Sequence, residues 1–200
     1  MIPIALSLPI ILSTFGIIFV AELPDKTAFA SLALATKYKA QQVIIGVWLA
    51  FVVQTIIAVF FGNLFHLLPA KPVHIASGLG FLLFAFLAFR RKEEKVEHEE
   101  EVKVAKLQRR YAPWITAFLV VFAAEWGDLT QLATATLVAH NGNPLSTGIG
   151  AVIGLWAVTI IAVVAGSRIS KILNPQKLNI LSGTLFGIVG IIVIISALYT

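Results

Sequence analysis

Six long apolar stretches constrain the fold of this chain more than any other feature. A helix needs about 20 apolar residues to cross a hydrocarbon core that is about 30 Å thick. Six segments reach or approach that length, and they cover roughly residues 7–33, 43–68, 73–90, 114–139, 146–167 and 178–199. Turn-forming residues such as Asn141-Gly142-Asn143-Pro144 lie between them. The sequence therefore predicts an all-α integral membrane protein with six transmembrane helices.

The composition excludes several other classes of protein. Charged residues make up 12% and hydrophobic residues 58% of the chain, whereas soluble chains average about 25% and about 45–50%. The net charge of +5 does not form a basic stripe on a water-exposed fold, so no nucleic-acid partner is expected. The chain has no cysteine, which excludes disulfides and thiolate metal sites. The lipid bilayer is the partner that this composition predicts.

A charged segment divides the apolar chain into two parts. From Arg90 to Arg110 it contains six of the ten acidic residues and eight of the fifteen basic residues. We expect a first transmembrane repeat over residues 1–90, a charged cytoplasmic loop over 91–113 and a second transmembrane repeat over 114–200. Mixed charges of this kind are typical of a solvated linker. Weak regulatory binding of cations to the acidic residues of the loop is the alternative.

Lysine and arginine predict the orientation of the helices, because cytoplasmic connections carry an excess of these residues. Thirteen of the fifteen basic residues fall on one side of the predicted membrane, Lys71 falls on the other, and Lys26 lies within a span. We expect a multi-pass protein of the inner (plasma) membrane with both termini outside the cytoplasm. Met1-Ile2-Pro3-Ile4 lacks the positive charge of a signal peptide, so we expect the first apolar stretch to be retained.

The remaining four acidic residues lie inside apolar stretches, in two copies of one motif. At an offset of 103 residues, Ala21-Glu22-Leu23-Pro24-Asp25-Lys26-Thr27 matches Ala124-Glu125-Trp126-Gly127-Asp128-Leu129-Thr130. Residues 74–81 match residues 179–186 at an offset of 105. Two matches at nearly one offset indicate a duplicated three-helix unit. Because three is odd, the second copy must enter the membrane from the opposite side, which predicts two inverted-topology three-helix repeats, as in many secondary transporters.

Carboxylates inside a membrane require neutralisation. A charge at the bilayer centre costs at least about 2.5–3.5 kcal/mol, and Lys26 is the only basic residue inside a predicted span. One lysine cannot neutralise four carboxylates, so some of them must hold protons or bind a cation. Purely structural ion pairing is the less favoured interpretation.

The two motifs predict a cation site built from oxygen atoms. Glu and Asp three residues apart share one helix face, and Pro24 and Gly127 interrupt the helix between the acids. Carboxylate and other oxygen ligands suit hard divalent cations such as Mn²⁺, Ca²⁺ or Mg²⁺. The candidate ligands are Glu22, Asp25, Thr27, Glu125, Asp128, Thr130 and Gln131.

Other polar or aromatic residues in the spans have less specific interpretations. Gln54, Thr55 and the pair Ser31 and Thr134 can line a pathway or form hydrogen bonds between helices, and we favour the hydrogen bonds. Trp126, inside the second motif, is a candidate for the wall of the site. The histidines at positions 66 and 74 lie near no motif, and we expect them at the outer interface without a ligand role.

At these motifs the chain resembles a known family of small membrane cation transporters, which includes Golgi manganese/calcium–proton exchangers and bacterial manganese exporters. The hallmark of that family is a duplicated E-x-G-D-[KR]-[ST], with one copy in each three-helix half. Here Pro24 replaces the first glycine and Leu129 replaces the second basic residue. The resemblance implies that the four motif acids bind the cation, with Thr27 and Thr130 in support.

We therefore expect a secondary transporter, and not an enzyme, that exchanges divalent cations for protons. The resemblance implies Mn²⁺ export, with Ca²⁺ as a second substrate. The cation is cargo, so no resident cofactor is expected. The alternatives are an exporter of a cationic organic solute such as an amino acid, a channel, and an intramembrane aspartyl protease that would use Asp25 and Asp128. The sequence leaves ion selectivity, proton count and assembly as a homo-oligomer open.

Overall fold

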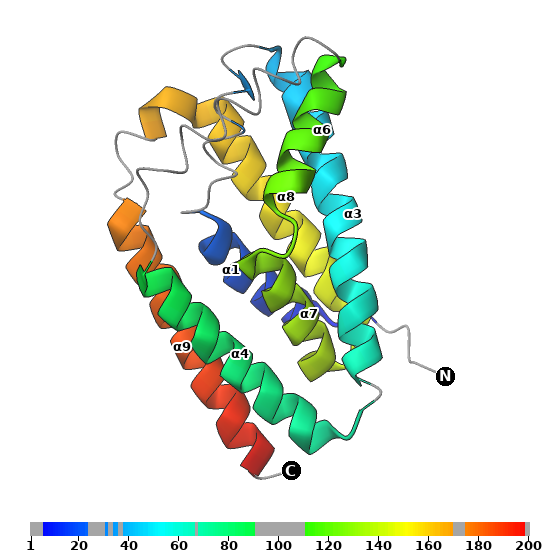
Figure 1. Ribbon diagram of the computed structural model, residues 1–200, viewed down its shortest axis with the longest axis vertical. Helices are drawn as coiled ribbons and strands as arrows, with labels where there is room; N and C mark the ends of the chain where they lie inside the picture. The colour runs from blue at the N-terminus through cyan, green and yellow to red at the C-terminus, as the bar shows by residue number, and fades with distance from the viewer. Residues whose placement is uncertain are drawn as a thin grey trace.

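The described part of the chain is a bundle of α-helices with no strand. The computed structural model describes residues 6–23, 31, 34–35, 38–66, 68–90, 111–169 and 175–198 (Figure 1). The helices of these residues are α1 (Leu8–Glu22), α3 (Ala40–His66), α4 (Ala70–Arg90), α6 (Pro113–Ala124), α7 (Leu129–Asn141), α8 (Pro144–Ile169) and α9 (Pro175–Leu198).

The lengths and composition of the helices confirm a membrane protein. Four segments are long and apolar enough to cross a bilayer: Ala40–Phe65, Lys71–Arg90, Pro144–Val164 and Ile180–Leu198. A fifth span results if α6 and α7, which are bent by 70° at a short break, are counted together. Helix α1 is apolar but has only 15 residues. The described residues therefore support four or five of the six predicted spans, and residues 24–30 of the first one lie outside them.

Large apolar side chains cover the outside of the bundle, as expected for helices that face lipid. Phe60, Val164 and Ile192 are among many that are more than half exposed. Local signals set the helix ends: Pro113, Pro144 and Pro175 each open a helix, at a position where the missing amide hydrogen removes no helical bond. The apolar surface therefore marks the face that the membrane would cover.

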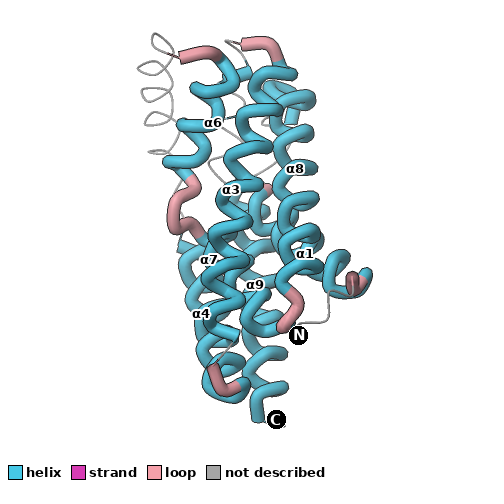
Figure 2. The backbone as a smooth tube through the Cα atoms, turned by 90° about the vertical axis from the view of Figure 1, so that its right-hand side faces the viewer, coloured by secondary structure: helices cyan, strands magenta, loops and turns pink. Residues whose placement is uncertain are grey.

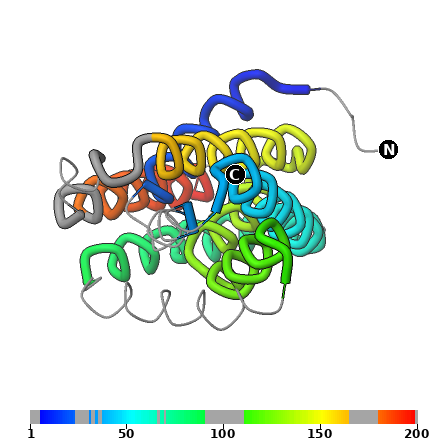
Figure 3. The backbone as a smooth tube through the Cα atoms, turned by 90° about the horizontal axis from the view of Figure 1, so that it is seen from above, coloured from blue at the N-terminus to red at the C-terminus, as the bar shows by residue number. Residues whose placement is uncertain are grey.

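Two groups of helices make up the bundle. Helices α4 and α9 pack against each other along their length, while α3 contacts α6, α7 and α8, and α1 packs on α8. Figure 3 shows α4 and α9 at one side of the molecule and α3 and α6 at the other. Helix α7 lies between these groups in Figure 1 and touches α4 as well as α3, while α1 packs on α8 and also touches α7 and α9. The C-terminal end of α1 and the N-terminal end of α7 therefore lie in the centre of the bundle.

Glycine contacts recur at the same offset in the two halves of the chain. Gly46 of α3 fits against the backbone of Trp114 in α6, and Gly150 of α8 fits against the backbone of Ile11 in α1. A Cβ atom on Gly150 would lie 2.5 Å from the carbonyl oxygen of Ile11, and one on Gly46 would collide with that of Trp114. The partners are related by offsets of 104 and 103 residues. Small residues of this kind let membrane helices approach closely, and here the same approach is made twice.

The pairing of α4 with α9 shows the same correspondence. Gly78 packs against Ile194, and Gly183 packs against the ring of Phe89. Gly183 follows Gly78 by 105 residues, and Ile194 follows Phe89 by the same 105 residues. A further match, which the sequence analysis missed, is the identical run Thr-Ile-Ile-Ala-Val at residues 55–59 and 159–163. Sequence matches thus relate α1 to α6, α3 to α8 and α4 to α9.

Candidate cation site

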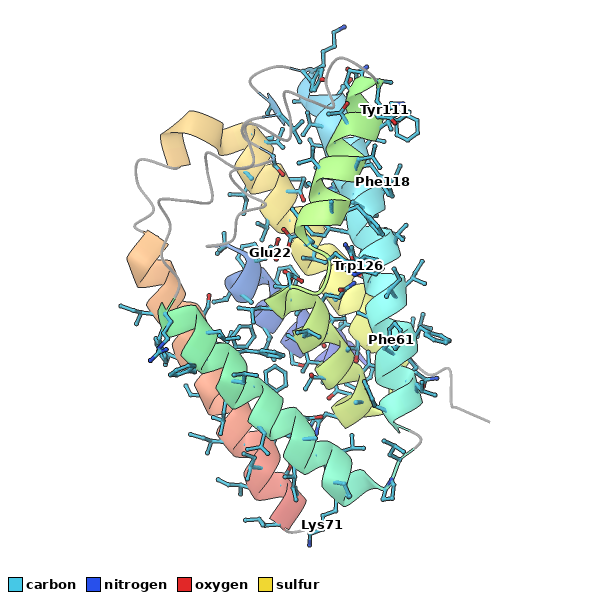
Figure 4. All side chains as sticks on the ribbon, in the orientation of Figure 1. Glu22, Phe61, Lys71, Tyr111, Phe118 and Trp126 are labelled. Carbon is cyan, nitrogen blue, oxygen red and sulfur yellow. The ribbon has the colours of Figure 1, made fainter. Side chains whose placement is uncertain are left out.

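Three acidic side chains from distant parts of the sequence meet inside the bundle. Glu22 ends α1, Glu125 follows α6, and Asp128 precedes α7. One carboxylate oxygen of each lies within 4.8 Å of the others, and the residues are 0%, 1% and 9% exposed, respectively. Figure 4 shows Glu22 close to the loop that carries Trp126. Two residues that are 103 positions apart therefore contribute to one buried acidic cluster.

The break between α6 and α7 positions two of these acids. Gly127 has φ 72°, a left-handed conformation that glycine adopts without a steric penalty. Asp128 caps α7, since its Oδ1 accepts a hydrogen bond from the amide of Gln131 at 2.8 Å and its Oδ2 accepts one from the hydroxyl of Thr130 at 2.7 Å. Figure 2 shows this loop about halfway along the bundle. The helix interruption that Gly127 predicts is therefore present, and it lies about halfway along the length of the helix bundle.

Two glutamines brace the break from a neighbouring helix. Gln54 of α3 donates a hydrogen bond from Nε2 to the carbonyl oxygen of Phe122 at 2.8 Å. Its Oε1 accepts one from Nε2 of Gln131, and Oε1 of Gln131 accepts one from the amide of Gly127 at 2.8 Å. The chain of bonds runs from one side of the break to the other. Gln54 therefore does make the interhelical hydrogen bonds that the sequence analysis favoured.

A small cavity lies beside the acids. Its volume is about 10 Å³, close to the minimum that one water molecule needs. Its walls are formed by residues of α3, α7, α8 and the break: Phe51, Gln54, Thr55, Ala58, Glu125, Asp128, Thr130, Gln131, Thr134 and Leu155. The space and the oxygen-rich lining suit a single dehydrated ion.

The carboxylates of the acidic cluster repel one another when they are ionised, and a bound cation or protons would remove that repulsion. Two full negative charges no more than 4.8 Å apart repel each other by at least about 3.5 kcal/mol at an effective dielectric constant of about 20. Three charges give three such pairs. The arrangement can therefore hold its full negative charge only with a nearby positive charge, and otherwise must take up protons.

The structure brings most of the sequence-predicted residues together. Thr130 and Gln131 lie at the cavity with Glu125 and Asp128, and Thr134 also lines it and donates from its hydroxyl to the carbonyl oxygen of Thr130 at 2.8 Å.

The remaining predicted residues have different outcomes. Asp25 and Thr27 of the first motif lie outside the described residues, as do Pro24 and Lys26. Trp126 does not form the site wall: it is 61% exposed and packs on Phe122 instead.

The family model "Divalent cation/proton antiporter GDT1" matches residues 10–96 and 113–200. The two matched segments lie one in each half of the chain and leave out residues 97–112 of the charged loop. No solved structure gives a significant match.

Relatives of this chain include proteins of a cyanobacterium and of plants. GDT1-like protein sll0615 of Synechocystis sp. is 31% identical over 184 residues, which cover 85% of this chain and 89% of that protein. Protein PAM71, chloroplastic, of Arabidopsis thaliana is 32% identical over 199 residues, covering 87% and 53% of the two chains. GDT1-like protein 2, chloroplastic, of Oryza sativa subsp. japonica is 30% identical, with 87% and 57% covered. The chain thus spans nearly all of the cyanobacterial relative and just over half the length of the chloroplast ones.

Proposed function

Because this chain belongs to the GDT1 family of divalent cation/proton antiporters, we propose that Glu22, Glu125 and Asp128 bind the cation that it exchanges for protons. The observation that carries the proposal is the convergence of three buried carboxylates from both halves of a membrane protein. A transporter of this family is not an enzyme. The proposed ligands include Thr130 as a supporting hydroxyl, with Asp25, Thr27 and Gln131 completing the set that the two motifs predict.

The exchange follows from competition for the same oxygen atoms. A divalent cation binds when the carboxylates are deprotonated, and its charge offsets their mutual repulsion. When the cation leaves, protons take its place, because an empty and fully ionised cluster is too costly inside a bilayer. The site therefore changes its access from one side of the membrane to the other only when it holds either a cation or protons. This requirement couples the cation flow to the proton flow.

Mn²⁺ is the proposed principal cargo and Ca²⁺ the second one. All side chains of the cluster offer oxygen, and the chain has no cysteine, so soft ions lack a suitable ligand. A cavity of about 10 Å³ has no room for an amino acid, which disfavours an organic cation. Export from the cytoplasm across a bacterial-type plasma membrane is the proposed direction, as in the manganese-exporter branch that the motif resembles.

The proposed architecture is six spans in two inverted three-helix repeats. The paired glycine contacts of α3 with α6 and of α8 with α1 support it, as does the self-similar pairing of α4 with α9. The separate matching of the two halves by the family model is a third support. In the proposed orientation both termini lie outside the cytoplasm and residues 91–113 lie inside, because the basic residues gather on that side.

Reconstitution of the purified protein tests this function. Proteoliposomes with an internal pH probe are expected to move protons out when Mn²⁺ enters, and the reverse. Replacing both Glu22 and Glu125 by glutamine is expected to abolish Mn²⁺ uptake and the linked proton signal together. A matched control is Glu97→Gln with Glu99→Gln in the charged loop, which also removes two carboxylates and is expected to leave transport unchanged. Wild-type transport by the Glu22→Gln, Glu125→Gln protein would contradict the proposed site.

A further inference from the structure

Two histidine side chains meet at the far end of α7 from the cation cavity. The ring centroids of His74 and His140 are 4.6 Å apart, with the ring planes at 59°. His74 lies in the first turns of α4, and His140 lies in the last turn of α7. We call these two residues the histidine pair. Each half of the chain supplies one ring, so sequence reading, which gave His74 no ligand role and did not single out His140, missed the pair.

Each ring of the pair has a buried nitrogen atom in need of a partner. The Nδ1 atoms of both residues are inaccessible to solvent and have no hydrogen-bond partner among the described residues. A buried imidazole nitrogen without a partner is unfavourable. Two such atoms on neighbouring rings point to one occupant that both can bind.

The two helices that carry the histidine pair hold few charged residues near it. Within α7 the described residues include no acidic side chain and no other basic one. On α4 the nearest charge is Lys71, which is exposed and points away from the bundle in Figure 4. Neutral imidazole nitrogens without carboxylates favour borderline transition-metal ions, whereas Ca²⁺ and Mg²⁺ prefer oxygen. The chemistry of this place therefore differs from that of the acidic cluster.

We propose that His74 and His140 form a second metal site, for a divalent transition-metal ion that prefers imidazole ligands, with Zn²⁺ as its probe. Two protein ligands leave positions for water, so the bound ion exchanges readily. The site lies about 18 Å along α7 from Asp128, at twelve residues and about 1.5 Å each. A bound ion would tie α4 to α7, the helix that carries the cap of the acidic cluster at its other end. The proposal does not depend on the function proposed for that cluster.

Zinc binding to the purified full chain, with any polyhistidine tag removed, tests the site. By calorimetry in saturating Ca²⁺, the wild-type protein is expected to bind one Zn²⁺ per chain that His74→Gln and His140→Gln each lose, or bind at least tenfold more weakly. The control is His98→Gln, which removes a histidine of the charged loop and is expected to bind like the wild type. Equal zinc stoichiometry and affinity in all four proteins would overturn the proposal.

A spectroscopic measurement avoids dependence on the variants. The X-ray absorption spectrum of the wild-type protein loaded with one equivalent of Zn²⁺, in saturating Ca²⁺, is expected to show two imidazole ligands at about 2.0–2.1 Å. A spectrum with oxygen ligands alone would place the ion elsewhere and refute the pair as a site. If Zn²⁺ binds through imidazole while Mn²⁺ transport fails in proteoliposomes, the histidine site stands and the proposed function falls.

Discussion

Gln54 is the residue whose replacement best tests how the helix break serves the proposed cation site. It lies on α3, 3% exposed, and it is not one of the three clustered acids. Its side chain donates to Phe122 and accepts from Gln131, which in turn holds the amide of Gly127. Gln54→Leu keeps the approximate size of the side chain and removes both hydrogen bonds. We regard Gln54 as a positioning residue for Glu125 and Asp128.

The expected magnitude follows from the two lost bonds. Each leaves a partly buried polar group without its partner, namely the Phe122 carbonyl oxygen and the Gln131 amide, and a buried group in that state costs about 1–3 kcal/mol. If the loop between α6 and α7 rearranges so that these groups find other partners, it must return to its original conformation when the cation binds, and the same free energy is then lost from binding. A cost of about 1.4 kcal/mol corresponds to a tenfold change in affinity. We therefore expect the Mn²⁺ concentration for half-maximal transport to rise by about tenfold to a hundredfold.

Proteoliposome uptake of Mn²⁺ over a range of concentrations measures this effect. The maximal rate is expected to change less than the half-saturation concentration, since the carboxylates themselves remain. The control is Gln41→Leu, the same substitution on the same helix at an exposed position, and it is expected to behave like the wild type. A folded Gln54→Leu protein with a half-saturation concentration within twofold of the wild type would refute the positioning role.

Three further predictions separate the structural from the functional part of the proposed site and test the repeated packing. Asp128→Ser retains a capping oxygen and is expected to abolish Mn²⁺ transport while thermal unfolding in detergent stays near wild type; Asp128→Ala is expected to lose transport and about 1 kcal/mol of helix stability as well. Gly46→Ala and Gly150→Ala are each expected to destabilise the protein by about 1–3 kcal/mol through overpacking. Gly16→Ala, which meets no atom within 4 Å, is expected to be neutral or to stabilise helix α1 by up to about 1 kcal/mol in the same unfolding assay. Equal melting temperatures in all three variants would contradict the close approach. Gly127→Ala is expected to cost about 1–2 kcal/mol at its positive φ and to weaken Mn²⁺ binding, and an unchanged binding isotherm would show that the loop tolerates another conformation.

Several features of this protein could be predicted from sequence because they depend on local chemistry. The free energy of placing a side chain in hydrocarbon is a property of each segment, so the apolar stretches predict the spans. A carboxylate in such a segment is costly wherever it lies, so the four motif acids stand out without a structure. Gly127 between two acids likewise predicts the interruption after Ala124, because glycine and its neighbours set the backbone conformation locally.

Contacts between segments were much harder to predict. Gln54 carries no motif, and its hydrogen bonds run to residues 68 and 77 positions away. The prediction that Trp126 forms the wall of the site was wrong, because its place within the motif does not show which way the backbone turns at Gly127. The meeting of His74 with His140 left no signal in the sequence, because the two residues lie in different halves of the chain and in neither copy of the acidic motif.

By itself, the sequence determined that this chain is helical, membrane-spanning and internally repeated, and that its intramembrane acids belong to two copies of one motif. The tertiary structure decided that Glu22 lies with Glu125 and Asp128 in one buried cluster, that Gln54 braces the break beside it, and that two histidines face each other at the end of α7. The physical reason is that burial cost and backbone preference act residue by residue. The approach of helices, by contrast, depends on small residues such as Gly46 and Gly150, whose effect appears only when both surfaces are in place.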